Sequence, residues 1–246
     1  MSALIVIPAR GASTRLPGKM LADISGKPLI VRTYQSVVAA NVGDVVVACD
    51  GDEIASVIRN AGGTAILTDP NLPSGSDRVY AACKEYDPNG KYKFVINVQG
   101  DMPFVAAEFI QKSHEVLLKS NCDISTIATP INDDSYLKES VVKPVIAFYE
   151  KNSGKALYFS RSPVPFGGPY YHHVGIYGFK TESLERFISL PQGILEQAEK
   201  LEQLRALENS MTIGIDVVDI DQPISVDTPA DLEFARQWYL QQGDTG

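Results

Sequence analysis

The residues with the clearest chemical potential lie in segments that directly follow apolar runs. The first such segment continues the apolar start of LIVIPARGASTRLPGKM, residues 4–20, and holds Arg10, Arg15 and Lys19. Gly11 and Gly18 let the backbone approach a ligand closely, and the positive side chains suit phosphate groups. The loop therefore favours phosphate binding. The alternative is a solvated surface loop that pairs with the excess acid of the chain.

The spacing in this loop excludes the two most familiar phosphate-loop signatures. Six residues separate Gly11 from Gly18, and Met20 stands where a Walker motif needs Ser or Thr after its lysine. The G-x-G-x-x-G fingerprint of dinucleotide-binding proteins is also missing, which makes a dehydrogenase a distant alternative.

A second candidate segment is NVQGDMP, residues 97–103. An apolar run ends there in Gln99, Gly100 and Asp101. A carboxylate at the end of a parallel strand, facing a phosphate loop, is a suitable Mg²⁺ ligand, because Mg²⁺ is held by one or two carboxylates plus substrate phosphates. The alternative is that Asp101 only caps the following helix.

The segment ISVDTPADLE, residues 224–233, supplies a second acidic candidate. Thr228, Pro229 and Asp231 match the cap, the first-turn proline and the acidic third position of a helix start. This assignment leaves Asp227 without a structural role. Two strand-end aspartates and a basic glycine loop together suit metal-assisted phosphoryl or nucleotidyl transfer.

The segment PSGSDR, residues 73–78, is a turn that opens a helix. We expect Ser76 to cap this helix. Arg78 then lies in the first turn, where the helix dipole disfavours a positive charge. A ligand, a carboxylate partner or simple surface exposure would each account for an arginine at this position.

In the second half, Arg161, His172, His173 and Tyr177 are concentrated in two short segments. An arginine can bind a carboxylate through two hydrogen bonds, and His and Tyr can bond a polyhydroxylated substrate. Each histidine alone is more often a buried structural residue. The pair lacks the nearby third ligand that a zinc site needs.

The apolar patterning of the first half alternates between strands and helices, which predicts an α/β fold with a doubly wound parallel sheet. The expected strands are 3–8, 44–50, 64–67, 93–101 and 123–130, and the expected helices are 27–41, 51–63, 77–86 and 106–120. Pro28 suits the first position of its helix.

After about residue 140 the pattern changes to strands with little helix between them, which predicts a smaller antiparallel lobe. The expected strands are 141–150, 155–161, 172–179 and 211–220, and a helix is expected over 227–242. We also expect one long amphipathic helix over 193–209, with Ile194, Ala198, Leu201 and Leu204 on its apolar stripe.

Composition narrows the class of protein. The chain has 246 residues and a net charge of −8, which argues against a nucleic-acid partner. Its three cysteines are far apart and follow no metal-binding spacing, which is typical of reduced thiols in the cytoplasm. No apolar run is long enough for a membrane span, so no membrane partner is expected.

We expect a single domain over 1–246, with the inserted lobe at about 140–180.

Taken in chain order, these segments resemble a known family. IPARGASTRLPGKML, SGSDR, NVQGDMP, HHVGIYGF, AEKLEQLRALEN and VDTPADLE follow one another as in the 3-deoxy-manno-octulosonate (Kdo) cytidylyltransferases of lipopolysaccharide precursor synthesis. The resemblance extends from residue 3 to about residue 236. The opening motif is shared with other sugar nucleotidyltransferases, whereas HHVGIYGF and LEQLR narrow the match to this family.

The resemblance implies a Rossmann-like nucleotidyltransferase fold and a Mg²⁺-dependent reaction of CTP with a Kdo-type sugar acid to give the CMP-sugar and pyrophosphate. It implies a site made of four groups of residues. The catalytic residues would be Arg10, Lys19, Asp101 and Asp227, and Asp101 and Asp227 would also bind the metal. The nucleotide is bound by Pro8, Ala9, Arg10, Gly11, Ser13, Lys19, Ser74, Gly75, Arg78 and Gln99. The sugar acid is bound by Arg161, His173, Tyr177, Glu202 and Gln203.

The resemblance also suggests a homodimer built through the second-half lobe, and no residue is assigned as general base. Two alternatives stay open. The enzyme would activate another acid sugar, such as amino-Kdo, sialic acid or pseudaminic acid. Otherwise the chain would be a catalytically silent nucleotide-binding protein on the same fold, an interpretation that the presence of Lys19, Asp101 and Asp227 disfavours.

Overall fold

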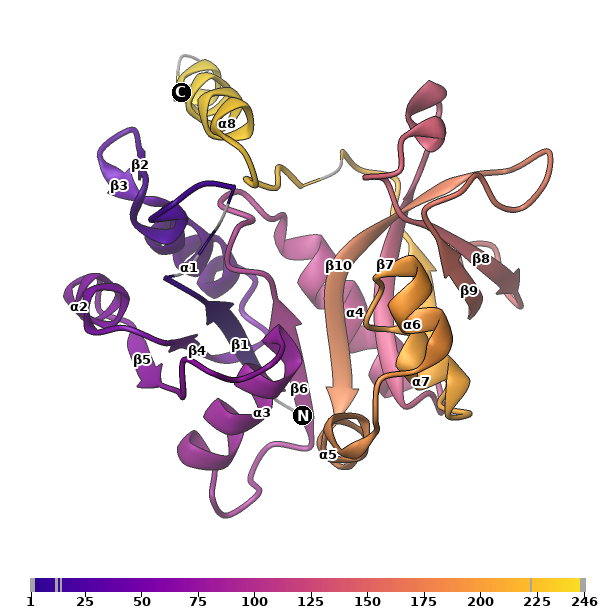
Figure 1. The fold of residues 1–246 in the computed structure, drawn as a ribbon, viewed down its shortest axis with the longest axis horizontal. Helices are drawn as coiled ribbons and strands as arrows, with labels where there is room; N and C mark the ends of the chain where they lie inside the picture. The colour runs from indigo at the N-terminus through magenta and orange to yellow at the C-terminus, as the bar shows by residue number, and fades with distance from the viewer. Residues whose placement is uncertain (1–2, 12, 14, 222, 244–246) are drawn as a thin grey trace. The chain divides into compact units, whose positions relative to one another are not determined.

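The computed structural model describes residues 3–11, 13, 15–221 and 223–243 (Figure 1). These residues belong to two compact units, which we treat separately. The first unit comprises Met1–Tyr92, Asn97–Ile110 and Pro223–Gly246, and the second comprises Lys93–Ile96 and Gln111–Gln222. The single domain with a lobe at about 140–180 stays a prediction. None of the described helices combines the length and apolar character that a membrane span requires.

The first unit is built on three parallel strands, of which β1 is the most deeply buried. β1 (Ala3–Ala9) is buried along its whole length, as its uninterrupted apolar sequence requires. β4 (Gly43–Cys49) pairs with it in parallel, and β5 (Thr64–Leu67) pairs with the other edge of β4. A short hairpin of β2 (Asp23–Ile24) and β3 (Lys27–Pro28), which we did not predict, follows the opening loop.

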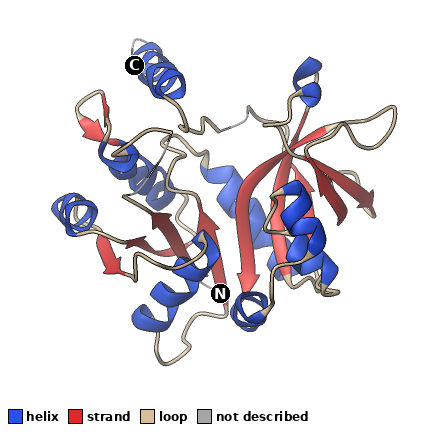
Figure 2. Ribbon diagram, in the orientation of Figure 1, coloured by secondary structure: helices blue, strands red, loops and turns tan. Residues whose placement is uncertain are grey.

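Helices connect these strands, as the alternating pattern predicts (Figure 2). α1 and α2 contact each other, and α3 packs against the three strands on the face away from α1 (Figure 1). Their bounds, with the short helix η1 and the C-terminal helix, are η1 Lys19–Leu21, α1 Leu29–Ala39, α2 Asp52–Asn60, α3 Gly75–Tyr86 and α8 Pro229–Gly243. β6 (Phe94–Val98) and α4 (Ala107–Lys119) each contain residues of both units.

Two predicted helix starts are corrected. Pro28 is the cap of α1 and ends β3, so it precedes the helix instead of opening it. Ser74, not Ser76, caps α3: its hydroxyl accepts from Asp77 N at 3.2 Å and donates to the Asp77 carboxylate at 2.6 Å. The physical reason is that Ser74 has an acidic residue three positions later, whereas Ser76 has Val79 there.

The second unit has mostly antiparallel pairing. β10 runs antiparallel to β7, β8 and β9 form an antiparallel pair, and β11 joins the two groups by pairing parallel to β7 and antiparallel to β9. The bounds are β7 Ile124–Pro130, η2 Asp134–Leu137, β8 Lys143–Phe148, β9 Ser153–Ser160, β10 Tyr171–Lys180, α5 Thr181–Ser189, α6 Ile194–Glu199, α7 Leu204–Glu208 and β11 Ile213–Val217. The predicted α/β class, with a parallel sheet and a smaller antiparallel part, is confirmed.

The long helix predicted over 193–209 is wrong. The chain forms two short helices, α6 and α7, and Lys200 between them adopts a left-handed conformation with φ 56°. Of the predicted stripe, Ile194 is 82% exposed, whereas Leu204 is fully buried. The amphipathic pattern therefore holds only for the second half of the segment.

A buried ion pair explains the break. Arg205 on α7 donates to the Glu196 carboxylate on α6 at 2.8 and 2.6 Å, and both side chains are almost fully buried. Residues nine apart on a continuous helix would be separated by roughly 13 Å along its axis. The pair can form only if the chain turns back between them. An unpaired buried charge costs several times more than a turn, so the pair determines the local fold.

Candidate functional site

The first unit places three chain segments side by side at the carboxyl ends of its parallel strands. In the β1–β4 register Ala9 faces Cys49, and in the β4–β5 register Cys49 faces Leu67. Arg10, Asp50 and Thr68 therefore follow their strands at one edge. This is the edge at which open α/β sheets bind their ligands.

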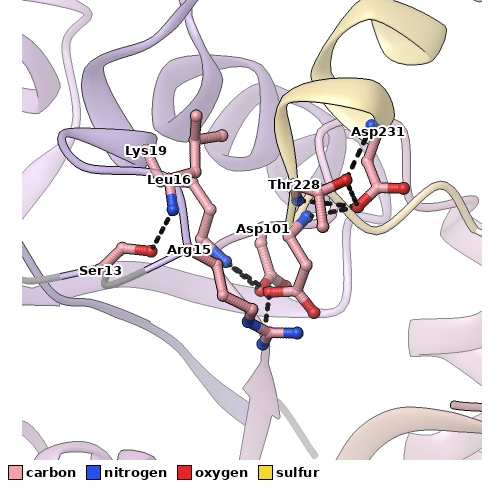
Figure 3. Close-up of polar contacts among 8 residues, drawn as sticks. Ser13, Arg15, Leu16, Lys19, Asp101, Thr228 and Asp231 are labelled. Atoms are coloured by element: carbon pink, nitrogen blue, oxygen red, sulfur yellow. Dashed lines mark hydrogen bonds and ion pairs between the residues drawn. The ribbon is translucent and has the colours of Figure 1, made fainter.

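Lys19 is the centre of a charged cluster at this edge. Its ammonium donates to Asp101 Oδ2 at 2.8 Å and to Asp227 Oδ1 at 3.0 Å (Figure 3). Arg15 adds a second cation, with Nη2 at 3.1 Å from the same Asp227 oxygen. The Lys19 side chain is 8% exposed and that of Arg15 is 66% exposed. The structure thus brings together the predicted catalytic lysine and both predicted metal ligands.

Two backbone features bring Lys19 and Asp101 to this place. Gly18 has φ 68°, a left-handed conformation that suits glycine, and it opens the short helix in which Lys19 lies. A Cβ on Gly100 would lie 2.7 Å from Pro8 O, so only glycine allows the segment before Asp101 to lie against the end of β1. The geometry of the cluster therefore requires glycine at positions 18 and 100.

Asp227 is positioned by the start of α8. Asp231 Oδ2 accepts hydrogen bonds from the backbone N–H groups of Asp227 and Thr228, at 3.0 and 2.8 Å, and Thr228 Oγ1 accepts from Asp231 N at 3.2 Å. The predicted capping arrangement is present, and it leaves the Asp227 carboxylate available. Val226 N donates to Asp101 O at 2.9 Å, which holds the two aspartate segments together.

Asp101 is not a helix cap, because α4 begins only at Ala107. Burial raises the pKa of Asp101, and the nearby Lys19 charge opposes that rise. Burial alone would lower the pKa of Lys19, but the charge and hydrogen bonds of Asp101, followed by those of Asp227, raise it. Lys19 is therefore fully protonated at neutral pH.

Arg78 has the carboxylate partner that its position at a helix start requires. Its side chain is fully buried, with Nη2 at 3.7 Å from Asp50 Oδ2, and Nη1 donates to Thr68 Oγ1 at 2.5 Å. Burial lowers the pKa of Arg78; the Asp50 charge opposes this, and the positive charge of Arg10 adds to it. The guanidinium stays charged at neutral pH, because an arginine starts from a very high pKa.

Asp50 is a residue that our sequence reasoning missed. Besides facing Arg78, its Oδ1 accepts from Gly11 N at 2.7 Å, which fastens the opening loop to the end of β4. The signal was a strand-end aspartate in the predicted strand 44–50, the same signal that singled out Asp101 and Asp227. A cavity of about 200 Å³ lies between this loop and the start of α2.

The other residues predicted for the nucleotide lie at the same edge. Pro8 and Ala9 are buried at the end of β1, Arg10 is exposed, and Ser13 Oγ accepts from Leu16 N at 3.4 Å. The half-buried Gly75 opens α3, and a Cβ added to it would lie 3.8 Å from Pro8 Cγ. Ser74 and Gln99 are half-buried.

In the second unit, His173 and Tyr177 on β10 lie close together, with ring centroids 5.4 Å apart. His173 Nε2 is 2.8 Å from Thr126 Oγ1. Burial, with a smaller effect from His172, lowers the pKa of His173 to about 3. Burial, with the Glu202 charge, raises the pKa of Tyr177. Both side chains are therefore neutral at pH 7.

Glu202 and Gln203 lie in the turn between α6 and α7, a position fixed by the Glu196–Arg205 pair. Gln203 is 4% exposed, and its Nε2 makes no hydrogen bond within the described part of the chain. The charge of Glu202 adds to the burial that raises the pKa of Tyr177.

Arg161 contacts the same turn. Its guanidinium donates to three backbone carbonyls, Glu199 O at 2.9 Å, Lys200 O at 3.4 Å and Glu139 O at 2.9 Å. Two of these carbonyls end α6, where a helix leaves such groups without partners. No carboxylate forms an ion pair with Arg161 among the residues that the structure describes. Its charge is thus held in place by neutral groups.

No cluster of three or more His, Cys, Asp or Glu side chains with metal-binding geometry occurs in the described ranges. The predicted metal ligands are the two carboxylates that converge on Lys19. Cys49, Cys83 and Cys122 are all buried free thiols, and burial raises the pKa of Cys83 to about 12.

Known proteins resemble this chain over most of its length. A family model described as cytidylyltransferase matches residues 4–213. A 3-deoxy-manno-octulosonate cytidylyltransferase from Parvibaculum lavamentivorans is 52% identical, over 95% of this chain and 91% of the relative. The protein of the same name from Paramagnetospirillum magneticum is 48% identical, over 96% of this chain and 97% of the relative.

Solved structures give the same result. A CMP:2-keto-3-deoxy-manno-octonic acid synthetase complexed with CTP superposes with a TM-score of 0.89 at 35% identity, over 98% of this chain and 100% of the other. An apo UDP-glucose pyrophosphorylase has a TM-score of 0.72 at 11% identity, over 98% of this chain and 99% of the other, and shows a shared fold only.

The lowered pKa of His173 predicts a loss of stability in mild acid. An unfolded histidine takes up a proton near pH 6.5, whereas the folded side chain stays neutral until about pH 3. Stability contributed by this residue is present above pH 6.5 and is lost as the pH falls. His173 alone should lower the free energy of unfolding by about 2 kcal/mol between pH 7 and pH 5, and His172, whose pKa burial lowers to about 4, should add to this loss.

Urea unfolding at the two pH values, followed by circular dichroism, measures this loss. The matched variant His173→Gln should lose correspondingly less stability between pH 7 and pH 5. An equal loss in both proteins would show that His173 is not responsible.

Proposed function

The chain belongs to the 3-deoxy-manno-octulosonate cytidylyltransferase family, and we propose that it transfers CMP from CTP to Kdo, with release of pyrophosphate, for lipopolysaccharide synthesis. The observation that carries this proposal is the cluster of Lys19, Asp101 and Asp227 at the end of the basic glycine loop. It combines a phosphate-binding cation with two carboxylates at the ligand edge of the sheet.

The acidic pair fits a magnesium ion. Asp101 and Asp227 already converge on one cation, and both offer the hard oxygen donors that Mg²⁺ prefers. Two carboxylates are also the number that Mg²⁺ takes when substrate phosphates complete its ligands. When bound, the ion would supply positive charge that stabilises the transferred phosphoryl group.

The protein itself would act by positioning and by charge. In the reaction the anomeric hydroxyl of the sugar acid forms a bond to the α-phosphorus of CTP, the α–β phosphoanhydride bond breaks, and the hydroxyl proton is released. Arg10 and Lys19 would hold the triphosphate and stabilise the charge that grows on the leaving pyrophosphate. No side chain is assigned as the general base.

For the nucleotide we assign different tasks to the predicted residues. Arg78 is fully buried, so it would act indirectly, by fixing Asp50 and Thr68 behind the loop. The nucleotide would contact two groups of residues: the backbone of Pro8, Ala9 and Gly11, and the half-buried Ser74, Gly75 and Gln99. Ser13 would support the loop through its hydrogen bond from Leu16 N.

For the sugar acid, the second unit offers neutral donors and one fixed cation. Gln203 Nε2 and the protonated Tyr177 hydroxyl suit sugar oxygens, and the neutral His173 supports the Tyr177 ring. The Arg161 guanidinium is held by carbonyls and pairs with no carboxylate among the residues described, which suits it to the substrate's own carboxylate. Glu202 would accept a hydrogen bond from a sugar hydroxyl.

The proposed reaction predicts that pyrophosphate release needs both CTP and Kdo. Purified protein would be assayed with Mg²⁺ and each of the four nucleoside triphosphates, with and without Kdo. The expected result is that pyrophosphate is released only when both CTP and Kdo are present. Release only with amino-Kdo, sialic acid or pseudaminic acid would retain the mechanism and change the substrate. No release with any pair would favour a catalytically silent nucleotide-binding protein.

Asp50 should act as a positioning residue for the nucleotide loop. Asp50→Ala removes the acceptor of Gly11 N and the partner of Arg78, so we expect the KM for CTP to rise by about 10-fold, since a hydrogen bond to a charged group contributes about 1.5–3 kcal/mol. The KM for Kdo should change little.

Glu85→Gln is the matched control, because it removes an exposed carboxylate at the far end of α3. Steady-state kinetics with each substrate varied measures both effects. An unchanged KM for CTP in Asp50→Ala would refute the positioning role.

We further propose a cytoplasmic homodimer that associates through the second-unit hairpin β8–β9. Leu157 and Phe148 are 54% and 40% exposed there, and such apolar side chains on one hairpin favour an interface. Leu157→Lys should shift the protein from dimer to monomer in sedimentation velocity. Leu240→Lys on α8, where the leucine is 63% exposed, is the control and should leave the dimer intact. A wild-type monomer would contradict the proposal.

A further inference from the structure

The Lys19 ammonium lies at the point where the two candidate metal ligands converge. One nitrogen atom contacts Asp101 Oδ2 at 2.8 Å and Asp227 Oδ1 at 3.0 Å, and the side chain is 8% exposed (Figure 3). These are short, charge-assisted contacts of a largely buried cation. The same two carboxylates are the candidate ligands for a divalent cation.

We propose that Lys19 is an internal counter-ion that a divalent metal must displace, so that the metal binds firmly to Asp101 and Asp227 only when a nucleotide triphosphate takes over the lysine. This inference rests on the proposed function and adds an order of binding to it. Lys19 would then have two positions, on the aspartates without nucleotide and on phosphate oxygens with it.

Electrostatics requires this exchange. An ammonium and a divalent cation that shared the two carboxylates would be only a few ångströms apart, and like charges at that distance repel strongly in a partly buried site. Moving Lys19 away without a new partner would leave a largely buried ammonium uncompensated. A triphosphate solves both problems, because it provides oxygens for the metal and negative charge for the lysine.

Arg15 provides an internal comparison. It contacts the same Asp227 oxygen at 3.1 Å, but its side chain is 66% exposed and it makes no described contact with Asp101. An exposed ion pair of this kind contributes little and is easily given up. Removing the charge of Arg15 should therefore affect metal binding much less than removing the charge of Lys19, although both changes subtract one positive charge.

The test measures Mn²⁺ binding in the absence of nucleotide. Electron paramagnetic resonance of the free Mn²⁺ ion reports how much of the ion is bound. Lys19→Gln should bind Mn²⁺ at least ~10-fold more tightly than the wild type, because the competing cation is gone. Arg15→Gln should stay within about 3-fold of the wild type. Equal affinity in the wild type and Lys19→Gln, or no binding by either, would overturn the inference.

A second measurement uses the wild type alone and does not depend on how the variant folds. Acetylation of lysines by acetic anhydride, read by peptide mass spectrometry, would compare Lys19 with the exposed Lys151. Lys19 should react slowly without metal and faster as Mn²⁺ is raised to saturation. Saturation with Mn²⁺ while Lys19 stays protected would overturn the inference, because the two cations would then not compete.

An arm with CTP separates this inference from the proposed function. Ultrafiltration would measure the Mn²⁺ that wild-type protein and Asp101→Asn retain in the presence of CTP, compared with CTP alone. Retention by the wild type and its loss in Asp101→Asn supports the metal site itself. If the wild type retains none, the metal assignment within the proposed function fails. If the wild type retains Mn²⁺ with CTP and binds it equally tightly without nucleotide, the exchange of Lys19 is refuted, whereas the metal site is not.

Discussion

The structure of the first unit depends on one constraint, the need to compensate two carboxylates that lie within hydrogen-bond distance of one atom. Asp101 and Asp227 would repel each other without the buried ammonium of Lys19 between them. The three residues are far apart in the sequence, so the chain must bring three segments to one point. The glycine before Asp101, the left-handed Gly18 and the capped start of α8 are the local features that make this possible.

The second unit compensates its buried charges in a different way. Its buried pair, Glu196 with Arg205, is internally neutral and fully hydrogen-bonded, so it serves to fold the chain between α6 and α7. Arg161 in turn is held by carbonyl groups. Charge thus stabilises the local fold at Glu196 and Arg205, whereas Arg161 has no carboxylate partner within the described part of the chain. In the first unit, the cations Lys19 and Arg15 both face carboxylates.

Asp101 could be predicted because it follows an apolar run. Asp227 stood out once Thr228 and Asp231 were explained as a cap, although residues 223–227 form no strand, so the predicted strand end there is wrong. Apart from the hairpin β2–β3, the strands followed from periodicity, as did helices α1 to α4 and α8, whereas α5 was not predicted. The break between α6 and α7 could not be predicted, since it depends on an ion pair nine residues apart and its turn uses Lys200 instead of glycine. Asp50 escaped notice because its role is to hold Gly11 and Arg78, contacts that only the register of β1 and β4 creates.

The location of charge also suits the two anionic substrates of the proposed reaction. A triphosphate needs mobile cations that can change partners during the reaction, and Lys19 and Arg15 are bound only to carboxylates that a metal can claim. A sugar acid needs one cation in a fixed direction together with neutral donors that distinguish hydroxyl groups. Arg161 with its carbonyl partners, and the neutral Tyr177 and Gln203, have that character. Exchangeable partners therefore favour catalysis, and fixed partners favour specificity.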